Sequence, residues 1–338
     1  MFDRVTLQHF GPWSALDWKN LGGINLILGG NGSGKTFLLK AIYSALRTLE
    51  TYKRGDEPRS ASEILLEKLH WTFQAEKVGD LVQRSAAGAL SFALHEQEAQ
   101  FAYSFGRDTT RQINSLENHF KPRSANSIFL PAKEILSLHA IILKAREQDR
   151  AFGFDDTYYD LALALKQSTS RGKNYKEFAD ARSRLEHMLG GAISLEADSN
   201  RWYFTNQQRQ RFSMGVTAEG IKKIAILDTL LGNRYLALDS VVLIDEPEAA
   251  LHPRLICEFL DIIAQLAARG MQFFIASHSY FVLKKLYLLA QEKQLSIPVL
   301  SQEDAGWEQH DLLQAMPHNP IVRESVRLYE QEVELALT

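Results

Sequence analysis

The stretch that decides the fold is Gly29-Gly30-Asn31-Gly32-Ser33-Gly34-Lys35-Thr36, which matches the pattern G-x-x-x-x-G-K-[ST] at every fixed position. Before it, residues 24–28 (INLIL) read as a buried strand. After it, residues 37–48 carry apolar side chains at helical spacing. A glycine-rich loop between a buried strand and a helix is the setting in which this pattern binds phosphate groups.

Each residue type in this loop suits the phosphates of a nucleotide. Glycines let successive main-chain N–H groups face one concave surface, and the start of the next helix adds positive potential. We expect Lys35 to reach the outer phosphates and Thr36 to offer its hydroxyl to Mg²⁺. The alternative is a glycine-rich turn that happens to end in Lys-Thr. The predicted cofactors are ATP and Mg²⁺, and the predicted binding residues are Gly29, Gly30, Asn31, Gly32, Ser33, Gly34, Lys35 and Thr36.

Two carboxylates follow a second apolar run. Residues 241–244 (VVLI) predict a buried parallel strand that ends at Asp245 and Glu246. The carboxyl ends of such strands are where α/β sheets bind ligands. We therefore expect Asp245 to hold Mg²⁺ and Glu246 to orient and deprotonate an attacking water. The alternative is the preference of acids for a helix start, which explains the later Glu248 better than this pair.

A third strand is predicted over residues 271–276 and is followed by Ser277, His278 and Ser279. This order puts His278 on the same sheet edge as Asp245. A lone histidine is more often structural than catalytic. Its position directly after a core strand favours a hydrogen bond to the γ-phosphate or to the attacking water.

The remaining patterns predict an α/β fold with a mainly parallel sheet, N-terminal antiparallel strands and an inserted, mostly helical lobe. We expect an ATP-binding core split between residues 1–50 and 212–300, a lobe over 51–211, and a tail over 301–338 that ends in a helix. Within the lobe, residues 90–94 and 101–105 predict a hairpin. Helices are predicted over 37–48, 63–73, 134–146, 158–166, 175–189, 219–231, 253–268, 281–290 and 320–335, and further strands over 5–7, 15–18 and 297–300.

The composition limits the class of protein. The chain has 338 residues, 45% hydrophobic and 23% charged, which is typical of a globular protein with a sizeable core. A single cysteine excludes an internal disulfide, and the N-terminus lacks the layout of a signal peptide. The apolar stretches fall short of the ~20 residues that cross a bilayer. We expect a cytoplasmic protein that does not bind membranes.

The net charge of −3 supplies no general attraction to nucleic acid, so any DNA or RNA binding must come from a local patch. Short basic groups are the candidates for such a patch. They are Arg209 with Arg211, Lys222 with Lys223, Lys284 with Lys285, and Arg171, Lys173 and Lys176 in the lobe.

The order of these motifs resembles a known family. The phosphate loop, residues 217–223 (TAEGIKK), 243–253 (LIDEPEAALHP) and 276–279 (ASHS) resemble the heads of ABC-type ATPases, a P-loop NTPase fold. The branch is the one that contains RecF, the SMC proteins and the OLD-type ATPases of phage defence. In that family two heads enclose two ATP molecules, each phosphate loop facing the signature segment of the other head. The resemblance therefore implies a homodimer or a higher oligomer.

By this resemblance Lys35 and Thr36 correspond to the Walker A residues, Asp245 and Glu246 to the Walker B pair, and His278 to the switch histidine. The implied catalytic residues are Glu246, His278 and Lys35, and the implied metal ligands are Thr36 and Asp245.

The implied signature segment binds ATP through Thr217, Glu219 and Gly220. Ala218 stands where the family has a serine, so the contact falls either to the Thr217 hydroxyl or to main-chain N–H groups at a helix start. Residues 249–252 correspond to the D-loop, with His252 in place of the aspartate usual in transporters. No glutamine matches the Q-loop, and residues 129–134 are the candidate for its place.

The predicted function is that of an ATPase head that dimerises around ATP, hydrolyses it with Glu246 and regulates a separate effector protein. By analogy with the OLD-like branch, the effector is a nuclease or toxin in anti-phage defence or DNA maintenance. Three alternatives stay open: a RecF-like, ATP-dependent DNA binder, a nucleotide-gated scaffold with little turnover, and the ATP-binding subunit of a transporter.

Overall fold

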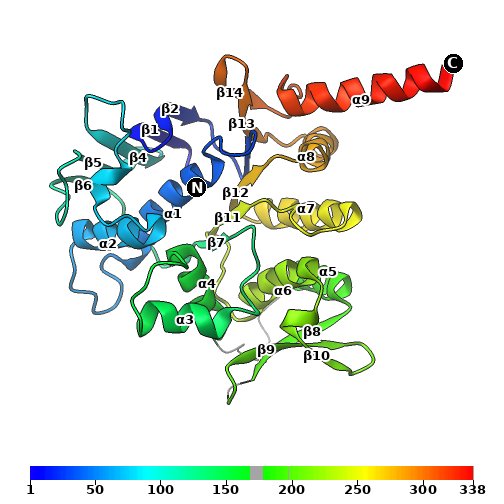
Figure 1. The fold of residues 1–338 in the computed structure, drawn as a ribbon, viewed down its shortest axis with the longest axis horizontal. Coiled ribbons are helices and arrows are strands. Elements are labelled where there is room, and N and C mark those ends of the chain that lie inside the picture. The colour runs from blue at the N-terminus through cyan, green and yellow to red at the C-terminus, as the bar shows by residue number, and fades with distance from the viewer. Residues whose placement is uncertain (168–177, 197, 338) are drawn as a thin grey trace.

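The centre of the computed structural model, which describes residues 1–167, 178–196 and 198–337, is a six-stranded sheet (Figure 1). Its strands lie in the order β14-β13-β3-β12-β11-β7. Neighbouring strands are parallel except for β13 and β14, which form an antiparallel hairpin. The bounds are β3 (Ile24–Leu28), β7 (Ile128–Leu130), β11 (Val241–Asp245), β12 (Gln272–Ser277), β13 (Pro298–Glu303) and β14 (Gly306–Asp311).

Both faces of the sheet are buried at β3, β7, β11 and β12, which is why these four strands are largely apolar runs. Side chains alternate between the faces: Leu26 and Leu28 join the apolar cluster of the helices that follow β7, whereas Ile27 joins that of the N-terminal strands and the first helix. Val242 likewise belongs to the cluster of the helices that follow β7, and Leu243 belongs to the cluster of the N-terminal strands and the first helix. The predicted mainly parallel α/β core is confirmed.

A five-stranded antiparallel sheet covers one side, in the order β2-β1-β4-β5-β6. The predicted hairpin is present, with Leu90 opposite Phe105 and Leu94 opposite Phe101. It pairs with the N-terminal strands and extends their sheet. The bounds are β1 (Arg4–Phe10), β2 (Trp13–Lys19), β4 (Leu90–Glu96), β5 (Ala99–Phe105) and β6 (Ser115–Asn118). A third sheet has three strands in the order β10-β9-β8. It is formed by β8 (Gly191–Glu196), β9 (Arg201–Asn206) and β10 (Arg211–Ser213).

Local signals in the sequence explain where several helices begin. Ser60 and Glu63 form a reciprocal capping box before α2, and His252 caps α7, which has Pro253 at its start. The helices of the described residues are α1 (Lys35–Thr51), α2 (Ala61–Phe73), α3 (His139–Glu147), α4 (Asp156–Lys166), α5 (Ala179–Leu189), α6 (Glu219–Gly232), α7 (Pro253–Ala267), α8 (Tyr280–Lys293) and α9 (Pro320–Leu337).

Two sequence-based expectations need correction. The helix expected from residue 134 begins only at His139, because the Glu134 carboxylate accepts hydrogen bonds from Ser137 and from Lys222, which holds residues 134–137 in a turn. The strand expected to end at Leu300 continues to Glu303 and turns into β14. The start of the helix predicted over 175–189 lies partly outside the described residues.

Strands cross the predicted domain boundaries. From the segment 51–211, β4 to β6 share a sheet with β1, and β7 pairs with β11 in the central sheet. The boundary at residue 301 falls within β13.

A network of buried charges joins α1, α2 and α4. Lys68 on α2 contacts Asp156 and Asp160 of α4 at 2.8 and 2.9 Å. Arg47 on α1 reaches the same Asp160 at 3.3 Å, and Tyr43 donates a hydrogen bond of 2.7 Å to it. This network connects the helix that follows the phosphate loop to the two helices beside it.

The last helix, α9, projects away from the body of the molecule (Figure 1), and none of its described residues is buried. It meets the body at its start, where Arg323 pairs with Asp304. None of the helices in the described part of the chain is long and apolar enough to cross a membrane.

Candidate functional site

The phosphate loop, residues 29–36, connects β3 to α1 at the carboxyl edge of the central sheet. Gly32 and Gly34 have φ angles of 73° and 97°, in the left-handed region that favours glycine. Gly34 also lies too close to Trp13 for a side chain, because Trp13 Nε1 donates a hydrogen bond of 3.1 Å to its carbonyl. The loop borders a cavity of about 480 Å³ lined by residues 31–37, Glu246 and His278.

Lys35 is buried and lies inside the loop, where its ammonium donates hydrogen bonds of 2.8 Å to the carbonyls of Gly29 and Gly30. Burial lowers the pKa of Lys35, and the nearby carboxylates of Glu246 and Asp245 offset part of that effect. The cation therefore faces the two acids across the loop.

Thr36 and Asp245 are in direct contact, so that both oxygen atoms could reach one cation. The Thr36 hydroxyl donates a hydrogen bond of 2.9 Å to Asp245 Oδ2, across the gap between α1 and the end of β11. Burial raises the pKa of Asp245, and the Thr36 hydrogen bond lowers it in part. Oxygen atoms of this kind are the ligands that Mg²⁺ prefers.

Glu246 and His278 meet at the edge of the same cavity. β11 and β12 are neighbours, and Asp245 pairs in register with Ala276, so the residues that follow both strands emerge side by side. His278 Nδ1 lies 3.2 Å from Glu246 Oε1. Glu246 has a φ angle of 48°, which turns its side chain out of the strand direction toward the loop.

Glu248, which the sequence interpretation treated as a helix-start acid, holds the histidine segment. Its Oε1 accepts hydrogen bonds from Ser277 Oγ at 2.8 Å and from the main-chain N–H of His278 at 3.1 Å. Its Oε2 is buried and has no partner among the described residues. The sequence does contain a hint of this role, because Glu248 is a third acid only two positions after Glu246 and so lies near the same edge of the sheet.

The signature segment, residues 217–223, does not line the cavity of the phosphate loop. The Thr217 hydroxyl donates to the Ser213 carbonyl at 3.0 Å, and no side chain caps the start of α6, where Glu219 and Gly220 lie. A side chain at position 220 would clash with the carbonyl of Ala250. The signature segment is therefore seated on residues 249–252.

Lys222 and Lys223 do not form the basic surface patch for which they were candidates, and this expectation is corrected. Both are buried. Lys222 bridges Glu219 at 2.6 Å and Glu134 at 3.1 Å. The Lys223 ammonium donates a hydrogen bond of 2.7 Å to the Glu246 carbonyl, and burial lowers its pKa to about 8.

Two of the other candidate basic residues are paired with acidic side chains. Arg211 pairs with Glu196 at 2.8 Å and stacks on Tyr203, while Lys285 pairs with Asp261 at 2.7 Å. Arg171, Lys173 and Lys176 lie outside the described residues.

Residues 129–134 lie on the side of the site where Thr36 and Asp245, the predicted Mg²⁺ ligands, are found. β7 ends at Leu130 beside β11, and the segment that follows it lines a cavity of about 360 Å³ together with Thr36, Asp245 and Tyr158. Burial raises the pKa of Tyr158 to about 12, with Asp155 and Asp245 contributing. The segment therefore lies beside Thr36 and Asp245, and its assignment as the counterpart of a Q-loop stays a prediction.

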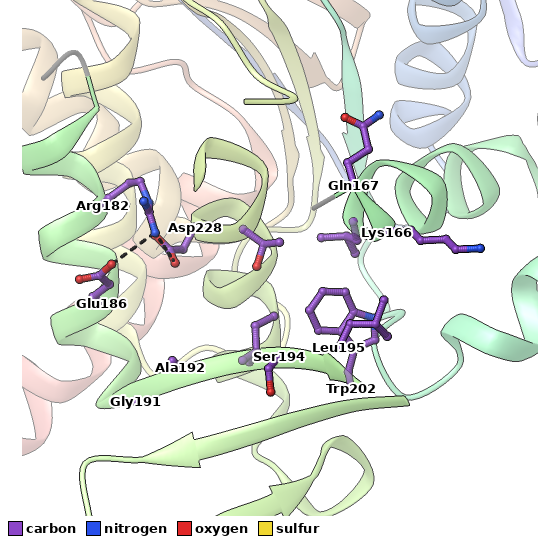
Figure 2. Close-up of a pocket in the computed structure, with 13 residues that line it drawn as sticks. Lys166, Gln167, Arg182, Glu186, Gly191, Ala192, Ser194, Leu195, Trp202 and Asp228 are labelled. Carbon is purple, nitrogen blue, oxygen red and sulfur yellow. Dashed lines mark hydrogen bonds and ion pairs between the residues drawn. The ribbon is translucent and has the colours of Figure 1, made fainter. Parts of the chain in front are cut away.

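Another cavity, of about 790 Å³, lies elsewhere, between the end of α4, α5 and β8 (Figure 2). Arg182 and Asp228 form an ion pair of 2.9 Å on one wall, and Trp202 lies opposite. Its rim includes Gln167, the last described residue before position 178.

The donor set of the phosphate loop fits a nucleotide with Mg²⁺. Ser33 Oγ is shielded from water and has no partner among the described residues, although it sits in a loop that faces the cavity. The Thr36 hydroxyl and Asp245 carboxylate supply oxygen ligands, and Lys35 supplies a cation for phosphate.

Comparison with known proteins agrees with this geometry. A family model described as "AAA domain, putative AbiEii toxin, Type IV TA system" matches residues 24–284. Among solved structures, the SmcHead bound to the C-winged helix domain of ScpA is similar at 12% identity over 93% of this chain and 99% of that chain, with a TM-score of 0.54. That likeness extends to the fold alone.

Two further SMC heads show weaker similarity. The SMC head domain from Thermotoga maritima is 16% identical over 92% of this chain and 98% of that chain, with a TM-score of 0.45. The Smc head with an extended coiled coil bound to the C-terminal domain of ScpA, derived from Pyrococcus furiosus, is 11% identical over 98% of each, with a TM-score of 0.49. No curated protein matches the sequence.

Proposed function

The chain belongs to the AAA family described as "putative AbiEii toxin, Type IV TA system", and from that premise we propose that it binds and hydrolyses ATP with Mg²⁺. The observation that carries the proposal is the meeting of three strand ends at one cavity. The phosphate loop follows β3, Asp245 ends β11 and is followed by Glu246, and His278 follows β12.

Each residue has a role in this reaction. Lys35 holds the outer phosphates, and Thr36 with Asp245 holds Mg²⁺, which when bound neutralises charge on the phosphate oxygens. Glu246 accepts a proton from water while the water oxygen bonds to the γ-phosphorus and the bond to the bridging oxygen breaks. His278, 3.2 Å from Glu246, orients the water or the γ-phosphate. The products are ADP and phosphate.

We propose that two copies close around ATP. The start of α6 supports this, because no side chain caps it and Ala218 and Glu219 are exposed there. Main-chain N–H groups at a helix start bind anions, so the phosphate contact of a partner's ATP falls to this helix start and not to Thr217, whose hydroxyl is engaged by Ser213.

We also propose that closure regulates a separate effector protein of nuclease or toxin type. The description of the family supports a role in toxin–antitoxin or phage-defence biology. A sharp test is to purify the chain with whatever protein accompanies it and to assay nuclease activity with and without ATP. ATP-dependent nuclease activity in the complex supports the proposal, and activity that ignores ATP contradicts it.

Glu246→Gln tests hydrolysis and closure together. We expect the variant to bind ATP as the wild type does, to lose at least about a hundredfold in turnover, and to change from monomer to dimer when ATP and Mg²⁺ are added. Turnover is measured by phosphate release and mass by light scattering. Lys35→Ala, which removes the phosphate cation, is the control and stays monomeric.

Each outcome separates the alternatives. Nucleotide binding with negligible turnover in both wild type and variant indicates a nucleotide-gated scaffold. Unchanged turnover in Glu246→Gln contradicts its role as the base. Affinity for DNA that requires ATP and falls with salt indicates a RecF-like binder.

A further inference from the structure

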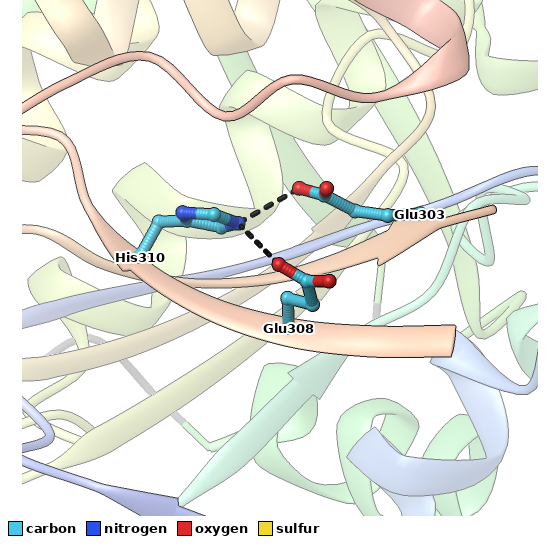
Figure 3. Close-up of side chains that lie close together, drawn as sticks. All are labelled: Glu303, Glu308 and His310. Atoms are coloured by element: carbon cyan, nitrogen blue, oxygen red, sulfur yellow. Dashed lines mark hydrogen bonds and ion pairs between the residues drawn. The ribbon is translucent and has the colours of Figure 1, made fainter. Parts of the chain in front are cut away.

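The hairpin of β13 and β14 carries three potential metal ligands on one face (Figure 3). Glu303 ends β13, and Glu308 and His310 lie two residues apart on β14. In the hairpin register Ser301 is opposite Glu308 and Val299 is opposite His310. Because side chains alternate along a strand, all three ligands point to the same side of the hairpin.

Their donor atoms converge. His310 Nε2 lies 2.7 Å from Glu303 Oε1 and 3.9 Å from Glu308 Oε2, and all three donor atoms lie within 4.8 Å of one another. Bonds of about 2.0–2.2 Å from Zn²⁺ to nitrogen and oxygen allow one ion to sit among donors spaced in this way. The three side chains therefore need little rearrangement to share a cation.

The donor types select the class of cation. One imidazole nitrogen with two carboxylates suits Zn²⁺, whereas Mg²⁺ takes oxygen ligands. The side chain of Glu308 is 49% exposed, compared with 14% for Glu303, so one side of the group is open to water. Three protein ligands and an open position are a common arrangement for zinc. We propose that Glu303, Glu308 and His310 form an accessory Zn²⁺ site, separate from the nucleotide site.

The opposite face of the same hairpin touches the phosphate loop. Gln302, beside Glu303, accepts a hydrogen bond of 3.1 Å from the main-chain N–H of Gly30. Trp307, beside Glu308, packs against Trp13 with ring centroids 4.6 Å apart. A cation that joins the two strands therefore fixes the residues next to both contacts.

The test is direct zinc binding to the full chain, without nucleotide. Protein is treated with EDTA, dialysed and titrated with ZnCl₂ by calorimetry, while the fluorescence of the five tryptophans, Trp307 among them, is recorded. We expect the wild type to bind one more Zn²⁺ than His310→Ala and Glu308→Gln do, or to bind it at least about tenfold more tightly. The wild-type fluorescence should change during the titration and that of Glu308→Gln should not.

His187→Ala, which removes an exposed histidine of α5, is the matched control and should bind zinc as the wild type does. Glu308→Gln guards against a folding artefact, because its side chain is half exposed and its loss cannot open the core. If both site variants bind zinc as the wild type does, or if the wild type binds none, the proposal is wrong. The His310–Glu303 contact is then only a cross-strand hydrogen bond.

Discussion

The Lys223 ammonium donates a hydrogen bond of 2.7 Å to the main-chain carbonyl of Glu246. Lys223 belongs to α6, which starts at the signature segment, and Glu246 is the proposed catalytic base. The contact matters for the base because Glu246 adopts a φ angle of 48°, which non-glycine residues rarely adopt without support from their surroundings. The start of α6 and the conformation of Glu246 are thus physically connected.

Replacing Lys223 by Met should slow turnover by about tenfold or more while ATP affinity stays within about twofold. The methionine keeps the length of the side chain but cannot donate to the Glu246 carbonyl, and the phosphate loop is untouched. Phosphate release and equilibrium nucleotide binding are the two measurements. Lys293→Met, on the exposed end of α8, is the control; equal turnover in Lys223→Met would contradict a positioning role.

Lys223 also predicts how stability depends on pH. Burial lowers its pKa to about 8 in the folded protein, below the ordinary 10.5. Between these pH values the unfolded chain binds more protons than the folded one, so the contribution of Lys223 to stability rises with pH across that window. Relative to Lys223→Met, the free energy of unfolding of the wild type should rise by about 2 kcal/mol from pH 8 to 10. Urea unfolding at both pH values measures it, and a fall would contradict the assignment.

Lys68→Met should destabilise the fold by about 3–5 kcal/mol. The substitution leaves the buried carboxylates of Asp156 and Asp160 without the cation that lies 2.8 and 2.9 Å away. Denaturant unfolding at neutral pH measures the loss. Lys77→Met, at an exposed position, is the control and should change stability by less than about 0.5 kcal/mol. A loss of that small size at position 68 would mean that Arg47, Arg146 or water already compensates the charge of the two acids.

Gly34→Ala should cost more stability than Gly55→Ala. Both positions have positive φ angles, 97° and 58°, so each alanine bears left-handed strain of about 1–2 kcal/mol. A Cβ at position 34 would in addition lie 2.9 Å from Pro12 and Trp13, whereas nothing lies within 4 Å at position 55. Thermal unfolding compares the two, and Gly34→Ala alone should also lose nucleotide binding. Equal losses of stability in the two variants would show that Trp13 can move away from the new Cβ without destabilising the fold.

The predictable part of the site depended on local patterns. Apolar runs that end in polar residues identify buried parallel strands, and such strands present those residues at one edge of the sheet. For this reason Thr36, Asp245, Glu246 and His278 could be placed together before any contact was known. The spacing of the phosphate loop is equally local.

The unpredicted part depended on contacts between distant segments. Lys222 and Lys223 read as candidates for a basic patch, because their partners, Glu134 and the Glu246 carbonyl, come from other parts of the chain. The polar residues after Ser301 read as a tail, because only pairing with β14 reveals a strand there. The anchoring role of Glu248 likewise needs the neighbouring strand β12.

The position of β3 has a consequence for the synthesis of the protein. β3 lies between β12 and β13, and the loop after it is tied by Gly29 to Ser277 and by Gly30 to Gln302. These partners leave the ribosome some 250 residues after β3 does. The chain therefore emerges with β3 lacking both neighbouring strands, and the loop after it gains these two partners only once β12 and β13 have been made.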